Sequence, residues 1–211
     1  MLKLIVGPMK AEKTGELIRL VKRASIGNKK VVVLSPQIDE RTAGEVLESR
    51  NGSKVKAFRV QSSELIRDYI DENVDIVFID EVHMWDEGVV REVCKLTDSG
   101  IAVICAGLDM NYMSAPFEIV SRLLALADEV EKLTSVCEEC GSDKGRRTAR
   151  YINGKPASFN SPEILVDGTN TSVVYKTFCN KCYRKIGMFG LGGYPMKNVE
   201  ISETKEVSLN Y

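Results

Sequence analysis

The feature that most constrains this chain is a segment near its start, Gly7-Pro-Met-Lys-Ala-Glu-Lys-Thr14. It follows an apolar run at residues 2–6 and precedes a stretch with helical spacing of apolar residues. An opening glycine and a closing Lys-Thr, placed between a strand and a helix, are typical of loops that bind nucleotide phosphates through backbone N–H groups. In such loops the lysine contacts the outer phosphates and the hydroxyl holds magnesium. The candidate phosphate-binding residues are Gly7, Lys10, Ala11, Glu12, Lys13 and Thr14.

Glu12 departs from this pattern, because a glycine is expected directly before the lysine. If the position requires a positive φ, a residue with a Cβ costs on the order of 1 kcal/mol or more. Its carboxylate would also repel a polyphosphate, unless Lys10 or a metal ion offsets the charge. We therefore expect weaker, not abolished, phosphate binding. The alternative is an ordinary strand–turn–helix connection in which the Gly and the Lys-Thr occur by chance.

Composition sets broad limits on the class of protein. With 211 residues, 44% apolar and 28% charged, the chain can form one α/β domain and a small accessory module. A net charge of −1 gives no indication of binding to nucleic acid or to an anionic membrane. The N-terminal apolar run is too short for a signal peptide, and no run approaches membrane-spanning length. We expect a cytoplasmic protein with neither a nucleic-acid nor a membrane partner.

Apolar runs alternate with helical patterns along the first two thirds of the chain. This alternation predicts an α/β fold with a mostly parallel sheet that is covered by helices on both faces. Gly27 and Gly100 are expected at helix ends. Strands are predicted at residues 2–6, 30–34, 55–60, 74–79, 101–106 and 130–136, and helices at residues 17–26, 65–70, 89–96 and 116–127.

Several polar residues follow predicted strands and should meet at one edge of the sheet. Ligands bind beyond the carboxyl ends of parallel strands, where Arg41, Asp80-Glu81 and the 108–112 segment would join the phosphate loop. Asp80 could reach magnesium held by the loop threonine, and Glu81 could act on a substrate hydroxyl. The alternative is that both acids only begin a loop. We interpret His83, the one histidine, as a hydrogen-bonded structural residue, with a catalytic role as the alternative.

The six cysteines divide into two kinds. Cys94 and Cys105 lie singly in apolar patterns, as small core residues do. The others form two CxxC pairs, which favour a structural zinc ion with tetrahedral thiolate ligands. Redox dithiols and free thiols are the alternatives. The long separation between the pairs predicts a substantial loop. The zinc ligands would be Cys137, Cys140, Cys179 and Cys182.

An ordered set of motifs adds a family resemblance. GPM…KT with ELIR is followed by D-x-R, S-x-NG, IDE, AGLD with an aromatic residue four positions after the leucine, Pro-Phe, VCxxC, and Tyr before a second CxxC. The chain resembles the tetrameric, zinc-containing class of thymidine kinases over about residues 1–185. The resemblance implies a RecA-like P-loop domain at residues 1–134, a small zinc-binding, zinc-ribbon-like domain at 135–186 that closes over the nucleoside, and a tail at 187–211.

The resemblance also implies roles for individual residues. Glu81 would be the base for the sugar 5′-hydroxyl, and Arg41 would stabilise the transferring phosphate. The phosphate loop and Asp80 would bind ATP and Mg²⁺, with Lys13 on the phosphates and Thr14 on the metal. The protein would be a homotetramer with nucleosides and nucleotides as its partners. The implied nucleoside-binding residues are Met9, Leu108, Tyr112, Phe117, Ile164, Val166 and Tyr175.

Some positions differ from the family pattern. His83 stands where the family usually has glutamine, Met84-Trp85 where it has two phenylalanines, and Tyr112 where it has phenylalanine. The first hypothesis is ATP-dependent phosphorylation of a deoxynucleoside, thymidine to dTMP. The second is a non-catalytic or weakly active nucleoside- or nucleotide-binding relative, which Glu12 would favour. The third is a zinc-dependent nucleic-acid module, which the near-neutral charge disfavours.

Overall fold

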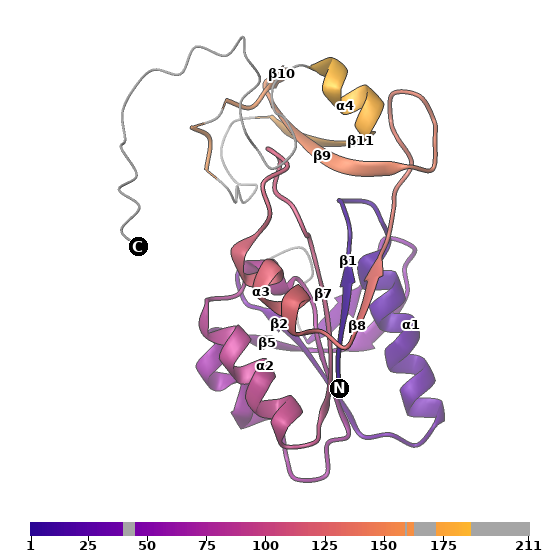
Figure 1. Ribbon diagram of the computed structural model, residues 1–211. Coiled ribbons are helices and arrows are strands. Elements are labelled where there is room, and N and C mark those ends of the chain that lie inside the picture. Colours follow the sequence, from indigo (N-terminus) through magenta and orange to yellow (C-terminus); the bar gives the residue numbers. More distant parts are fainter. Residues whose placement is uncertain (40–44, 159, 163–171, 187–211) are drawn as a thin grey trace, which may run out of the picture.

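The computed structural model describes residues 1–39, 45–158, 160–162 and 172–186. Within them the chain forms a larger part around a six-stranded sheet and a smaller part around a three-stranded sheet (Figure 1). The smaller part lies beyond the end of the larger sheet at which β1 finishes (Figure 1). This position puts it over the edge where the phosphate loop begins.

The larger sheet is parallel throughout, with strand order β5-β2-β6-β7-β1-β8. The predicted α/β class with a mostly parallel sheet is therefore confirmed. Because all strands run the same way, the segments that follow β1, β2, β6 and β7 meet at one edge. The strands are β1 (Leu2–Val6), β2 (Val31–Pro36), β5 (Phe58–Val60), β6 (Ile76–Ile79), β7 (Ala102–Gly107) and β8 (Glu129–Lys132).

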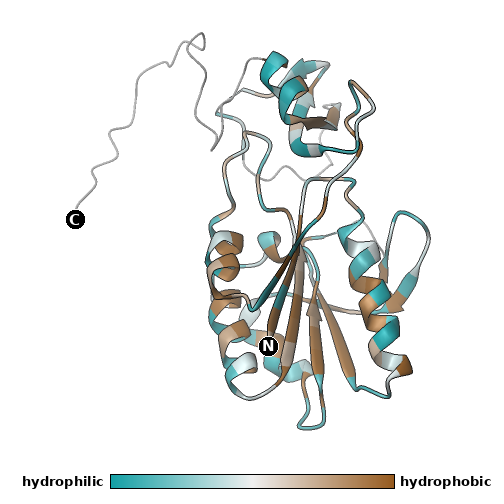
Figure 2. Cartoon of the chain, turned by 45° about the vertical axis from the view of Figure 1, so that its right-hand side comes forward, coloured by the Kyte–Doolittle hydropathy of each residue, from teal (hydrophilic) through white to brown (hydrophobic). Residues whose placement is uncertain are grey.

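Helices cover both faces of this sheet (Figure 2). Alternate strand residues point to opposite faces, so Leu4 and Val6 enter one core cluster and Ile5 the other. Helix α1 packs with Ile5, whereas α2, α3 and two 3₁₀ helices lie on the face of Leu4 and Val6. The helices are α1 (Lys13–Ile26), η1 (Ser63–Tyr69), η2 (Val82–Met84), α2 (Gly88–Asp98) and α3 (Glu118–Leu126).

Four local predictions need correction. The strand expected at 130–136 ends at Lys132 as β8, and Ser135 beyond it forms only an isolated β-bridge with Gly145. The strand expected at 55–60 is two strands, because the chain leaves a hairpin of β3 (Val46–Glu48) with β4 (Lys54–Lys56) and then enters the main sheet as β5. The helix expected at 65–70 is the 3₁₀ helix η1, a segment too short to gain much from α-helical cooperativity. The last helix begins after Pro116, which instead forms a β-bridge with Met110. Helix ends at Gly27 and Gly100 are confirmed.

The smaller part is an antiparallel sheet of order β10-β9-β11 with α4 packed against it. Its core contains three of the paired cysteines together with Phe178 and Tyr183. Its elements are β9 (Gly145–Ile152), β10 (Lys155–Pro156), β11 (Val173–Cys179) and α4 (Asn180–Ile186).

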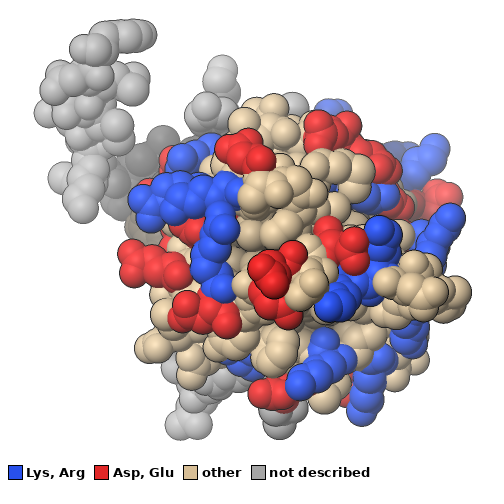
Figure 3. All heavy atoms as spheres, turned by 90° about the horizontal axis from the view of Figure 1, so that it is seen from below, with Lys and Arg blue, Asp and Glu red and all other residues tan. Residues whose placement is uncertain are grey.

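The surface agrees with the balanced charge. Seen from the end of the molecule opposite the smaller part, acidic and basic side chains are interspersed (Figure 3). In the described ranges no helix is both long enough and apolar enough to cross a membrane.

Candidate active site

A cavity of about 850 Å³ lies where the carboxyl edge of the larger sheet faces the smaller sheet. Its lining comes from the phosphate loop, from the ends of β6 and β7, and from β9 and β11. Of the predicted site residues, Arg41, Ile164 and Val166 lie outside the described residues, and Gly7 does not line the cavity. Those that line it are Met9, Lys10, Ala11, Glu12, Lys13, Thr14, Asp80, Glu81, Leu108, Tyr112, Phe117 and Tyr175.

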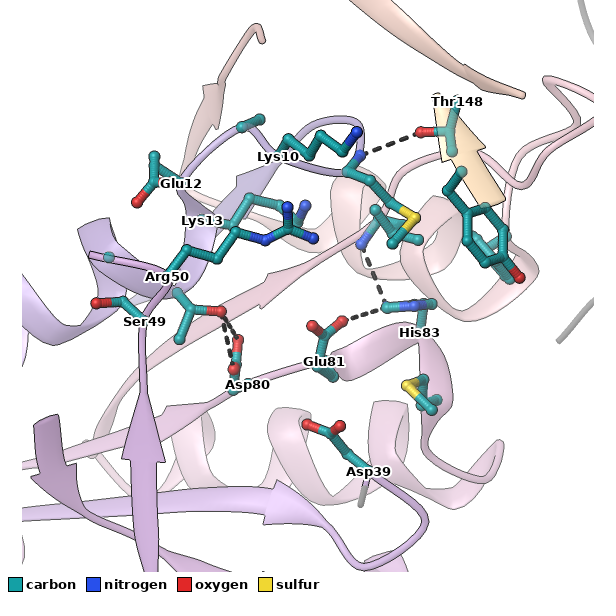
Figure 4. Close-up of a pocket in the computed structure, with 18 of the residues that line it drawn as sticks. Lys10, Glu12, Lys13, Asp39, Ser49, Arg50, Asp80, Glu81, His83 and Thr148 are labelled. Atoms are coloured by element: carbon teal, nitrogen blue, oxygen red, sulfur yellow. Dashed lines mark hydrogen bonds and ion pairs between the residues drawn. The ribbon is translucent and has the colours of Figure 1, made fainter. Parts of the chain in front are cut away.

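The backbone conformation of the phosphate loop shows why Gly7 is a glycine and whether Glu12 occupies a strained position. A Cβ on Gly7 would lie 2.6 Å from the carbonyl oxygen of Leu133, so only glycine fits there. Glu12 has φ 59° and ψ 26°, and Lys10 has φ 62°, so both non-glycine residues adopt the left-handed conformation. Position 12 therefore has the positive φ at which a residue with a Cβ is expected to be strained. Its exposed side chain is directed away from Lys13 (Figure 4).

Lys13, Thr14 and Asp80 are close together at the start of α1. The Lys13 ammonium is buried and donates a hydrogen bond to the carbonyl oxygen of Pro8 at 2.7 Å. The Thr14 hydroxyl donates to Asp80 Oδ2 at 3.1 Å (Figure 4). Hydroxyl and carboxylate oxygens are ligands that Mg²⁺ prefers, so this pair fits a magnesium ion. The indole N–H of Trp85 donates a hydrogen bond to the Asp80 carbonyl oxygen at 3.1 Å, which fixes the backbone of Asp80.

Glu81 lies one residue further along, with φ 48°, and is buried in the cavity wall. Its Oε2 is 3.4 Å from Nδ1 of His83, and that nitrogen accepts a hydrogen bond from the N–H of Leu108 at 3.2 Å (Figure 4). The His83 ring also stacks at a tilt on Phe117, with the centroids 4.8 Å apart. These contacts fit the structural role expected of His83, because they fix its ring between β6 and β7.

Aromatic residues and an arginine form the opposite wall. The Arg150 guanidinium lies over the ring of Tyr112 at 4.1 Å and over that of Tyr175 at 5.4 Å. The Tyr112 hydroxyl is 3.0 Å from the carbonyl oxygen of Ser158 and 2.8 Å from that of Ser161. Tyr112 therefore holds the chain on both sides of residue 159 as well as lining the cavity.

Several lining residues were missed in the sequence. Arg50 lies in the turn between β3 and β4, and Figure 4 shows it pointing into the cavity with Lys13. Asp39 is buried beside Arg59, whose Nη1 donates to its carbonyl oxygen at 2.6 Å. The S-x-NG motif contains Arg50 and was a usable signal, whereas nothing local marks the β9 residues Thr148 and Arg150.

The four paired cysteines form one cluster. Their Sγ atoms all lie within 4.8 Å of one another, and those of Cys140 and Cys179 are 3.9 Å apart. A tetrahedral zinc ion with Zn–S bonds of about 2.3 Å separates its sulfurs by roughly 3.8 Å, so the cluster could hold zinc. Burial raises the pKa of the Cys137 thiol, but backbone N–H groups outweigh this and lower its pKa to about 6, whereas burial and the neighbouring cysteines raise the pKa of Cys182 to about 12.

The single cysteine at the centre of the sheet behaves differently. Burial raises the pKa of Cys105 to about 12, so this thiol stays protonated. It belongs to the core cluster of Leu4 and Val6. The expectation of a small core residue therefore fits Cys105, whereas Cys94 is only partly buried.

A parallel α/β sheet with a phosphate loop after β1 and an Asp-Glu pair after β6 defines a P-loop protein. Comparison with known proteins identifies which kind. The sequence matches the thymidine kinase family model over residues 1–183. A thymidine kinase of Mesoplasma florum (strain ATCC 33453 / NBRC 100688 / NCTC 11704 / L1) is 39% identical over 186 residues, covering 86% of this chain and 90% of the relative. The chain belongs to the thymidine kinase family and is a kinase.

Proposed function

We propose that this kinase transfers the γ-phosphoryl group of ATP to the 5′-hydroxyl of a deoxynucleoside, converting thymidine to dTMP. The observation that carries the proposal is the shared cavity, in which the phosphate loop and the Glu81 carboxylate face an aromatic wall. One end of this cavity suits a polyphosphate and the other suits a nucleoside. The family match and the thymidine kinase relative support the choice of thymidine.

At the phosphate end, Lys13 neutralises charge on the outer phosphates, while Thr14 and Asp80 hold Mg²⁺. When bound, Mg²⁺ neutralises charge that develops on the phosphate oxygens. Arg50 supplies a second cation beside the loop. We keep the phosphate-stabilising role for Arg41 as a proposal from the family resemblance.

At the nucleoside end, Glu81 accepts the proton of the 5′-hydroxyl as that oxygen attacks phosphorus. The carboxylate is buried, so its position is set by packing and not by solvent. Rigid aromatic side chains contact the base at small entropic cost, and backbone groups around Ile164 and Val166 read its edge. The side chains proposed to contact the nucleoside are those of Met9, Leu108, Tyr112, Phe117 and Tyr175.

A second candidate is a relative that binds nucleosides or nucleotides but turns them over weakly. The observation in its favour is Glu12, which adopts a positive φ that a glycine would adopt without strain. Against it, Lys13, Thr14, Asp80 and Glu81 all line one cavity. Activity of the parent protein decides between the two.

The assembly around the site completes the proposal. We propose that the four cysteines bind one structural Zn²⁺, that residues 1–134 and 135–186 act as separate domains, and that the protein is a cytoplasmic homotetramer. The break between the parallel sheet and the antiparallel sheet supports the division. Light scattering coupled to size-exclusion chromatography measures the oligomeric state.

The test of the function is dTMP formation from thymidine and Mg-ATP, compared with a panel of other nucleosides. We expect Glu81→Gln to lower kcat by about 10²- to 10⁴-fold, the range for losing a general base, while thymidine still binds. The exposed Glu72→Gln is the matched control. If the parent forms no monophosphate from any nucleoside, the kinase proposal is wrong for these substrates.

A further inference from the structure

The phosphate loop is held by the smaller part of the molecule as well as by its own strand and helix. The N–H of Met9 donates to the Thr148 hydroxyl at 3.1 Å (Figure 4), and the Thr177 hydroxyl donates to the carbonyl oxygen of Met9 at 3.1 Å. Thr148 and Thr177 are directly paired across β9 and β11. One cross-strand pair therefore binds both backbone groups of a single loop residue.

A second contact lies one residue further along the loop. The Lys10 ammonium forms an ion pair with Glu138 Oε1 at 2.7 Å. The same carboxylate oxygen accepts from the N–H of Thr177 at 2.7 Å, and the Glu138 N–H donates to the Thr177 carbonyl at 2.8 Å. Because Thr177 is fully buried, it fixes both Glu138 and Met9 in place.

These contacts matter because the loop backbone is unusual. Lys10 and Glu12 both adopt positive φ without being glycine. Such residues cost of order 1–3 kcal/mol each and persist only where the surroundings determine the conformation. Neither residue can hold the loop by itself. The hydrogen bonds to Met9 fix the backbone directly before Lys10, the first of the two strained residues, and the ion pair attaches the Lys10 side chain to Glu138.

We propose that Thr177 and Glu138 are positioning residues for phosphate transfer: they hold Met9 and Lys10 so that the N–H groups of the phosphate loop face the donor phosphates. This inference rests on the proposed function for its substrate, Mg-ATP. It assigns the cysteine-containing part a role in donor binding, in addition to lining the nucleoside side of the cavity. In this proposal the Lys10 ammonium pairs with Glu138 and does not contact the phosphates.

The experiment measures the KM for Mg-ATP and the KM for thymidine separately in matched variants. Thr177→Val keeps the shape of the side chain but removes the hydroxyl donor, and Thr177→Ser keeps the donor. We expect Thr177→Val to raise the KM for Mg-ATP by about tenfold, the effect of one lost buried hydrogen bond. Thr177→Ser should restore the parent value, and the KM for thymidine should change less than the KM for Mg-ATP, because the nucleoside has several proposed contacts besides Met9. Lys155→Gln, at an exposed position on β10 of the same sheet, is the control.

The ion pair has its own test. We expect Glu138→Gln and Lys10→Met each to raise the KM for Mg-ATP by about twofold to fivefold, roughly the worth of an ion pair whose two side chains are each about one third exposed. The double variant should be no worse than either single variant, because both remove one interaction. If Lys10 instead contacts the phosphates, Glu138→Gln frees it and lowers the KM for Mg-ATP, which would overturn the proposal.

Failure of the inference can be told from failure of the proposed function. A parent protein that makes dTMP, with unchanged KM for Mg-ATP in a folded Thr177→Val, contradicts the inference alone. A parent that makes no dTMP contradicts the function, and calorimetric titration with Mg-ATP then compares parent and variants without turnover. Equal Mg-ATP affinity in all of them refutes the positioning role, whereas the predicted losses support it.

Discussion

Among individual residues, the left-handed backbone at Lys10, Glu12 and Glu81 is the clearest link between strain and site. All three line the cavity, and all three are non-glycine. Backbone strain of this kind collects at functional sites, where surrounding contacts sustain it. At Glu81 the strained backbone carries the proposed base, whereas at Glu12 it lies beside Lys13, the lysine proposed to contact phosphate. We therefore expect substitution of Glu81 to impair the reaction and substitution of Glu12 by glycine to improve Mg-ATP binding.

Changing Glu12 tests this difference. Glycine adopts φ near 59° without a Cβ penalty, so Glu12→Gly should lower the KM for Mg-ATP by about threefold to tenfold. Glu12→Ala is the control, because it removes the carboxylate but keeps the Cβ. Steady-state kinetics on both variants separates backbone strain from charge. An Mg-ATP KM that is the same in Glu12→Gly and the parent would show that the glutamate is accommodated.

Among the elements, η1 and α2 share a core cluster, and their contact also includes a buried carboxylate. Glu92 on α2 accepts a hydrogen bond from Lys95 at 2.7 Å, and its other oxygen is 3.6 Å from Nε of Arg67 on η1. The hydrogen bond from Lys95 holds the pKa of Glu92 below its usual value of 4.5, although burial opposes this. The charged form is thus the one that the fold stabilises.

This ion pair predicts a pH-dependent stability. Because the folded pKa lies below the unfolded pKa, the stabilisation is present above about pH 4.5 and is lost as the pH falls through the folded value. We expect Glu92→Gln to lower the free energy of unfolding by about 1–2 kcal/mol at pH 7, with a smaller difference below pH 4. Urea unfolding at both pH values measures this. Glu64→Gln, exposed on η1, should show no such difference.

In the whole molecule, the cavity exists because two parts with different cores face each other. The parallel sheet contributes the phosphate loop and Glu81, and the antiparallel sheet contributes Thr148, Arg150 and Tyr175. The smaller core is small and is centred on the cysteine cluster. A core of this size commonly requires a metal or disulfides for stability.

Removing zinc should therefore destabilise the smaller part of the molecule before the larger part. We expect about one zinc per chain by mass spectrometry, and a melting temperature lowered by roughly 5 °C or more after chelation. The fluorescence of Trp85, the one tryptophan, should stay near its native emission at 25 °C because this residue is buried in the larger core. Metal-free protein with unchanged melting temperature and activity would contradict a structural role for zinc.

Much of the fold could be read from local patterns. Strands such as β1 and β6, and helix ends at Gly27 and Gly100, follow from apolar periodicity and backbone preference, which are properties of short segments. The division of residues 55–60 between two sheets could not be read this way. Both halves have strand-like sequences, and only the partners available in space decide which sheet each half joins.

The sequence by itself determined the phosphate loop, the acid pair Asp80-Glu81 and the paired cysteines, because their chemistry is written in short motifs with set spacing. Only the tertiary structure decided that Glu12 has a positive φ, that Thr148 and Thr177 hold Met9, and that Glu138 pairs with Lys10. These contacts join residues more than a hundred positions apart. Their existence depends on how two separately packed cores meet, and no local pattern records that.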